Sequence, residues 1–179
     1  MNYKIMNKNI MLKVTLLLAT SLSMFCTGIM APALPFMKSS FIHIENSEFM
    51  IKLSMTMPNI LIAVFAPIFG LIFNTSSPKR VISFAILVYI ISGSYGFFSD
   101  SITNIMVSRA FLGIAIAAIM TIGSSAIARC FSGSERNHVM ALQTTTMSIL
   151  TIFTSIASGI VCDISWRYTF LLYALPLLL

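Results

Sequence analysis

The stretch that decides the fold is NIMVSRAFLGIAIAAIMTIGSSAIARCF, residues 104–131. No residue between Arg109 and Arg129 carries a charge, and Ile, Ala, Phe, Leu, Met and Gly dominate this interval. An uncharged apolar run of about 20 residues has the length of a helix that crosses the hydrocarbon core of a bilayer. We therefore predict a transmembrane helix over residues 104–129.

Arg109 stands at or just inside one edge of this helix. A guanidinium costs roughly 2.5 to 3.5 kcal/mol near the centre of a membrane helix and less toward its ends, so we expect it to face protein or a water-filled cavity. We further expect it to look inward, toward hydroxyl-bearing neighbours, which makes it a candidate functional residue. Steps of four and three residues from it define a stripe of small or hydroxyl residues, namely Gly113, Ala117, Thr121, Ser124 and Ala128. The alternative is that Arg109 snorkels to the interface and that the stripe serves only packing.

The composition indicates an all-α, multi-pass membrane protein. Of the 179 residues, 58% are hydrophobic and only 9% are charged, whereas soluble domains carry about 25% charged residues. The net charge of +6 comes from basic residues scattered at the ends of apolar runs, which leaves no basic face for a nucleic acid. The three cysteines lack the spacing of metal ligands, so we expect no metal and no cofactor.

Further apolar runs predict a helical bundle. Spans are expected at about residues 14–36, 50–73, 81–98, 104–129 and 139–161, followed by a partial sixth span at 168–179. Pro32 and Pro35 are expected to end or kink the first span, and residues 130–138 to form a loop. Twelve residues of helix measure about 18 Å, short of the roughly 30 Å core, so we expect the chain to stop inside the sixth helix. The expected fold is a single transmembrane bundle over residues 1–179.

The fifth span is unusually rich in hydroxyl side chains at helical intervals. These form one stripe, made of Thr144, Ser148, Thr151, Ser155 and Ser158. Such a stripe either lines an aqueous path or bonds to neighbouring helices, and the pattern leaves both interpretations open.

The basic residues predict the orientation. With a cytoplasmic N terminus, seven lie on the inner side (Lys4, Lys8, Lys13, Lys79, Arg80, Arg129 and Arg136) and only three on the outer side (Lys38, Lys52 and Arg167). Because Lys and Arg concentrate in cytoplasmic connections, we expect a protein of the cell membrane with its N terminus inside.

Several short motifs in the right order resemble the N-terminal half of a major facilitator superfamily transporter of the drug and metabolite efflux type. The motifs are Ala31-Pro-Ala-Leu-Pro35, the stretch from Gly70 to Arg80, Arg109 with Gly113, and Trp166-Arg167 followed by Phe170. The resemblance extends from about residue 12 to 176. It implies a six-helix bundle that is half of a larger carrier, working by alternating access.

The resemblance also implies two groups of functional residues. Gly70, Asn74, Lys79 and Arg80 occupy the place of a cytoplasmic gate loop, although Asn74 stands where the family carries an acid. Arg109 would hold an anionic substrate group or respond to proton binding, and the alternative is a hydrogen-bond clamp between helices. The first, second, fourth and fifth helices would line the substrate cavity.

The sequence thus predicts a secondary transporter whose partners are the bilayer, a small-molecule substrate and a C-terminal bundle that this chain lacks. The alternative is a truncated or degenerate membrane fragment without transport activity of its own. An enzyme is not expected, and no residue is a catalytic candidate, because the spans carry no paired acids, no His cluster and no nucleophile beside a base. No acid lies inside a predicted span, so the coupling ion is undetermined.

Overall fold

The computed structural model describes residues 2–41, 46–72 and 77–178, and throughout this part the chain is helical, without a strand. The elements in chain order are α1 (Asn2–Ser40), α2 (Ser47–Ile72), α3 (Pro78–Tyr95), the short 3-10 helix η1 (Gly96–Phe98), α4 (Ile102–Cys130), α5 (Gly133–Ile164) and the 3-10 helix η2 (Trp166–Leu178). Within these residues, five helices are long and apolar enough to cross a membrane. The predicted all-α membrane fold is therefore confirmed.

The helices extend beyond the predicted spans. Pro32 and Pro35 lie inside α1, which continues to Ser40, so the prediction that they could end the first helix is wrong. Prolines are tolerated within membrane helices because neighbouring groups satisfy the freed carbonyls. The last element is helical, as expected, but it begins at Trp166 and has the tighter 3-10 form.

The predicted loop at residues 130–138 is also wrong. Helix α4 ends at Cys130 and α5 begins at Gly133, which leaves a connection of two residues. Gly133 has a φ of 58°, in the left-handed region that favours glycine, and this allows the sharp reversal. Glu135 lies in the first turn of α5, where a carboxylate complements the helix dipole, so this charge marks a helix start and not a loop.

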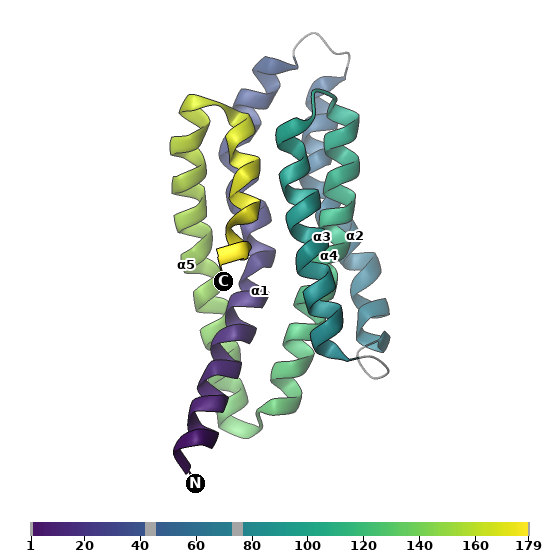
Figure 1. Ribbon diagram of the computed structural model, residues 1–179. Coiled ribbons are helices and arrows are strands. Elements are labelled where there is room, and N and C mark those ends of the chain that lie inside the picture. Colours follow the sequence, from purple (N-terminus) through teal and green to yellow (C-terminus); the bar gives the residue numbers. More distant parts are fainter. Residues whose placement is uncertain (1, 42–45, 73–76, 179) are drawn as a thin grey trace.

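The bundle divides into two groups of helices (Figure 1). Helices α2 and α3 pack mainly on α4, whereas α5 packs mainly on α1. Contacts between α1 and α4 join the groups, and η2 packs against α1, α3 and α5. Helices α1 and α4 bury more than half of their apolar windows, while α2 and α5 bury less than a quarter. The long apolar sequence around Arg109 is therefore the centre of the bundle.

Gly113 permits the close contact between α2 and α4. A Cβ atom at this position would lie 2.7 Å from the Cα atom of Pro58 and 2.8 Å from its carbonyl oxygen. These are backbone atoms that cannot easily move away. The small-residue stripe below Arg109 thus begins as a helix-packing surface, as is common in membrane bundles.

Candidate functional site

Arg109 lies in the interior of the bundle, with a relative exposure of 1%. Its guanidinium carbon is 4.7 Å from the centroid of the Phe170 ring and 4.8 Å from that of the Tyr173 ring. Both rings belong to η2, whereas Arg109 belongs to the second turn of α4. A guanidinium between two aromatic rings gains cation–π attraction, estimated at about 2 kcal/mol or more when water is excluded.

The three guanidinium nitrogens are buried and have no hydrogen-bond partner within the described residues. A buried donor without an acceptor loses about 1 to 3 kcal/mol of solvation, and a charged donor loses more. The rings therefore offset only part of the energy that this side chain gives up.

Two tyrosines fix the walls of this site. The Tyr89 hydroxyl of α3 donates a hydrogen bond to the Leu22 carbonyl at 3.2 Å, and the Tyr173 hydroxyl donates one to the Cys26 carbonyl at 3.1 Å. The two rings lie 5.7 Å apart, and both residues are fully buried. Because both bonds end on α1, they tie α3 and η2 to that helix and fix the position of the Tyr173 ring beside the guanidinium.

Two glycines, Gly93 of α3 and Gly96 at the start of η1, make room for the aromatic side chains of η2. A Cβ atom on Gly93 would lie 2.5 Å from the Cβ atom of Tyr173, and one on Gly96 would collide with the Phe170 ring. Sequence reasoning missed this arrangement, although two signals were present. Glycines three residues apart in one helical stretch face aromatic residues three residues apart in another, and this is the spacing at which helical side chains share a face.

The structure corrects one expectation about Arg109. The side chain does look inward, but its neighbours are aromatic rings of η2 rather than the Ser and Thr residues of the fifth span. In that stripe, Thr144 and Ser148 are exposed, while Thr151 and Ser155 are half-buried. The rings that contact the guanidinium thus belong to η2 and not to the hydroxyl stripe of α5.

The two ends of the hydroxyl stripe differ in their contacts. Ser158 is fully buried and donates a 2.6 Å hydrogen bond to the Ile29 carbonyl of α1. The Thr144 and Ser148 hydroxyls instead donate to carbonyls one turn earlier in α5 itself. The interpretation as interhelical bonding thus holds at Ser158, whereas the other end presents hydroxyl groups on an exposed surface.

The predicted gate residues are only partly described. Asn74 lies outside the described residues. Gly70 is half-buried in α2, and a Cβ atom there would make ordinary contact with Thr121 of α4 at 3.8 Å. Lys79 and Arg80 are exposed in the first turn of α3. Gly70, Lys79 and Arg80 lie near the C-terminal end of α2 and the N-terminal end of α3, whereas Arg109 is in the second turn of α4. Figure 1 shows the C-terminal end of α2 and the N-terminal end of α4 at opposite ends of the bundle.

Ion pairs connect the helices at both ends of the bundle. Lys13 of α1 pairs with Glu135 of α5 at 2.6 Å, and at the opposite end Arg167 of η2 pairs with Asp100. Glu48 lies between Lys38 and Lys52 at 3.0 Å from each. The described acids all lie in connections or within a turn of a helix end, and no three described His, Cys, Asp or Glu residues form a potential metal site.

Comparisons with known proteins complete this description. A family model described as Major Facilitator Superfamily matches residues 16–179 of the chain. A search of curated proteins finds no match. The matched region includes α1 from residue 16 onward and the whole of the other four helices that could cross a membrane, together with Arg109.

Proposed function

The chain belongs to the Major Facilitator Superfamily, and we propose that it works as the N-terminal half of an efflux-type secondary carrier. Members of this family are membrane transporters, so membrane transport of a small solute is the general function. The efflux direction, the alternating-access mechanism and the larger carrier belong to our proposal. That the protein is not an enzyme stays a prediction.

The observation that carries the proposal is the unpaired guanidinium of Arg109. A helix interior needs no cation for packing, and a charge within a membrane span is rare and usually functional. Here the cation is enclosed by Phe170 and Tyr173 and has no acceptor within the described residues. This favours a residue that exchanges partners during a cycle over one that serves as a fixed helix clamp.

We assign Arg109 a coupling role in that cycle. In one conformation the guanidinium stacks on the η2 rings, as it does here. In another it binds an anionic group, which either the solute or a proton-accepting acid of the carrier supplies. Alternation between the two states would move η2 relative to α4, since the rings and the cation are on different elements.

The exposed faces of α2 and α5 are the proposed contact with a second helical bundle. Both helices are only slightly covered by the rest of the chain. The exposed surface of α5 carries the hydroxyls of Thr144, Thr145 and Ser148, which is more polar than a surface that meets only acyl chains. We propose that these residues, with Thr151 and Ser155, line a solute path between α1, α2, α4 and α5.

We further propose that the α2–α3 end faces the cytoplasm of the cell and contains the gate. Lys79 and Arg80 are exposed there, and basic residues favour the inner side. Cys130 offers a direct test, because it is exposed at the same end, whereas Cys26 and Cys162 are buried. A membrane-impermeant maleimide should leave Cys130 unlabelled in intact cells and label it once the cells are permeabilised. Labelling of Cys130 before permeabilisation would reverse the proposed orientation.

The transport experiment uses the full-length polypeptide in cells loaded with ethidium or carboxyfluorescein, one cationic and one anionic fluorescent solute. Arg109→Ala should abolish efflux while the protein still inserts, and Arg109→Lys should retain part of it because the charge is kept. Arg136→Ala is the control, since Arg136 is exposed in the first turn of α5. Unchanged efflux in Arg109→Ala would remove the residue from the mechanism. Absence of efflux in the unmodified protein for a wider set of solutes would favour a fragment without activity.

A further inference from the structure

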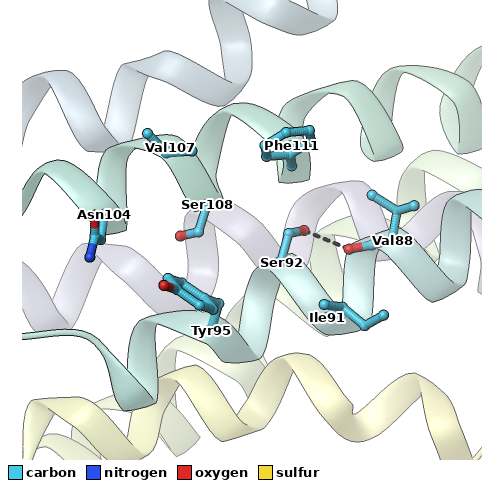
Figure 2. A pocket seen from close by; sticks show the side chains of 8 residues that line it. All are labelled: Val88, Ile91, Ser92, Tyr95, Asn104, Val107, Ser108 and Phe111. Atoms are coloured by element: carbon cyan, nitrogen blue, oxygen red, sulfur yellow. Dashed lines mark hydrogen bonds between the residues drawn. The ribbon is translucent and has the colours of Figure 1, made fainter.

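A groove of about 340 Å3 lies between α3 and α4, separate from the enclosed Arg109 site (Figure 2). Its size falls within the range of about 300 to 1,000 Å3 that is usual for small-molecule sites. Each helix contributes residues at positions i, i+3, i+4 and i+7, namely Val88, Ile91, Ser92 and Tyr95 from α3 and Asn104, Val107, Ser108 and Phe111 from α4. None of these side chains is charged.

The two hydroxyl groups at the floor of the groove already have hydrogen-bond partners. Ser92 and Ser108 are 7% and 5% exposed, and each hydroxyl donates a 2.7 Å hydrogen bond to a carbonyl of its own helix, Val88 for the first and Ile105 for the second. The small serine side chains create the hollow, but their hydrogen-bonding capacity is already used. An apolar chain can therefore occupy the floor without leaving a donor unpaired.

The rim of the groove opens sideways. Ile91, Val107 and Phe111 are each more than half exposed. Because α3 and α4 both have the length and polarity of membrane-crossing helices, this opening faces the bilayer and not water. Acyl chains are thus the molecules that meet the groove.

The two ends of the groove differ in polarity. Tyr95 is the last residue of α3 and Asn104 is the third of α4, and Figure 2 shows both at the same end, away from Val88 and Phe111. No hydrogen bond within the described residues engages the Tyr95 hydroxyl or the Asn104 amide, and both residues are exposed. The groove is therefore polar at one end and apolar at the other.

This polar end lies at the level of the membrane interface. The link between α3 and α4 follows Tyr95 directly, and the ring of Tyr168 at the start of η2 lies 5.7 Å from that of Phe97 in this link. Trp166 lies close to the same link, one residue before Arg167, which pairs with Asp100. Tyr and Trp concentrate at the membrane–water boundary, where lipid headgroups begin.

We propose that this α3–α4 groove binds one acyl chain of a membrane phospholipid. The chain lies over Ser92 and Ser108, with its terminal part toward Val88 and Phe111. The Asn104 amide and the Tyr95 hydroxyl donate hydrogen bonds to the ester or phosphate oxygens of that lipid. The site is on the lipid side of α3 and α4, so the proposal does not depend on what the protein transports.

The test places the full-length polypeptide in phosphatidylethanolamine–phosphatidylglycerol vesicles that contain a phosphatidylcholine with a diazirine in the middle of one acyl chain. After irradiation, labelled residues are mapped by mass spectrometry. We expect Ser92 and Ser108 to be labelled well above Ser54, a serine of α2 with 0% exposure. Labelling of Ser92 and Ser108 that is no higher than that of Ser54 would overturn the proposal.

Matched variants separate the groove from the general lipid surface. Val107→Trp fills the groove and should remove labelling of the floor, whereas Val64→Trp on α2 should leave it unchanged, since Val107 and Val64 are 52% and 56% exposed. Asn104→Leu should lower labelling at low probe concentration by about fivefold, the change in affinity that corresponds to the free energy of one hydrogen bond. Asn59→Leu, at an exposed residue of α2, should leave labelling unchanged.

A second probe identifies the occupant. A diazirine-bearing fatty alcohol has the same chain but neither ester nor phosphate. If it labels the floor as strongly as the phospholipid and is insensitive to Asn104→Leu, the groove takes amphiphiles in general and the phospholipid assignment is wrong. An equal loss of floor labelling in Val107→Trp and Val64→Trp would likewise overturn the site.

Discussion

Two polar regions of this membrane bundle differ in both burial and hydrogen bonding. The hydroxyls of Thr144 and Ser148 on α5 are exposed, yet each bonds to a carbonyl of its own helix. The guanidinium of Arg109 on α4 is fully buried, yet it bonds to no acceptor within the described residues. Hydroxyls of α5 are therefore expected to cost little wherever they point, whereas we expect the unpaired cation of α4 to lower the stability of the bundle. Such a loss is typical of a residue that function requires.

The largest expected effect comes from Arg109→Met, which keeps much of the side-chain volume and removes the charge. Transport should fall by roughly 30-fold or more, since about 2 kcal/mol of interaction with an anionic partner is lost. The free energy of unfolding should instead rise by about 1 kcal/mol, because an unpaired buried cation disappears. Transport is followed by fluorescent-solute efflux.

Unfolding can be followed by the reaction of a thiol dye with Cys26 and Cys162, which are buried, in a Cys130→Ser background that removes the exposed thiol. Thr144→Val on the exposed part of α5 is the control and should change stability little. If Arg109→Met destabilises the protein as much as a core cavity would, the arginine is a structural clamp. The conclusion that the α4 cation lowers stability while the α5 hydroxyls do not would then be wrong.

The second effect concerns the close packing of α2 against α4 at Gly113. Gly113→Ala should destabilise the bundle by about 1 to 3 kcal/mol, because the new methyl group meets the backbone of Pro58. Gly159→Ala on α5 is the matched control, since a Cβ atom there has no neighbour within 4 Å. Thermal unfolding of both variants in detergent gives the comparison. Equal behaviour of the two would show that α2 and α4 separate more easily than their contact implies.

A third prediction measures the attraction between Arg109 and its ring. Phe170→Leu should lose about 1 to 2 kcal/mol of stability in the unmodified protein through the missing cation–π contact and the lost ring packing. In the Arg109→Met background the same change should cost less, since only packing remains. The double-mutant cycle on thiol-dye unfolding isolates the difference. A coupling energy of zero would mean that the ring fills space without holding the cation.

The smallest effect distinguishes the two ends of the α5 stripe. Ser158→Ala removes the hydrogen bond to the Ile29 carbonyl and should lower stability by about 1 kcal/mol. Ser148→Ala removes only a bond within α5 and should be nearly neutral. Both are compared by thermal unfolding. A larger loss for Ser148 than for Ser158 would indicate that the exposed end of the stripe has a partner.

Much of the helical arrangement followed from local sequence. Spans near residues 50–73 and 104–129 could be predicted because each contains an uncharged apolar run of bilayer length, residues 53–73 and 110–128, and such a run favours a helix there. The connection at 130–138 could not, because Glu135 and Arg136 suit a loop and an exposed first helical turn equally well. The prediction that Pro32 and Pro35 could end the first helix failed for a similar reason, since neighbouring helices decide whether a proline interrupts a membrane helix.

The sequence by itself determined that this chain is a helical membrane protein and that Arg109 belongs inside it, because the energy of a charge in a bilayer depends mainly on composition and depth. Only the tertiary structure decided which neighbours enclose the cation. Phe170 and Tyr173 are more than 60 residues away in the sequence, and they reach Arg109 because Gly93 and Gly96 let η2 approach α3. Contacts of this kind depend on how distant helices pack together, and no local pattern of residues specifies them.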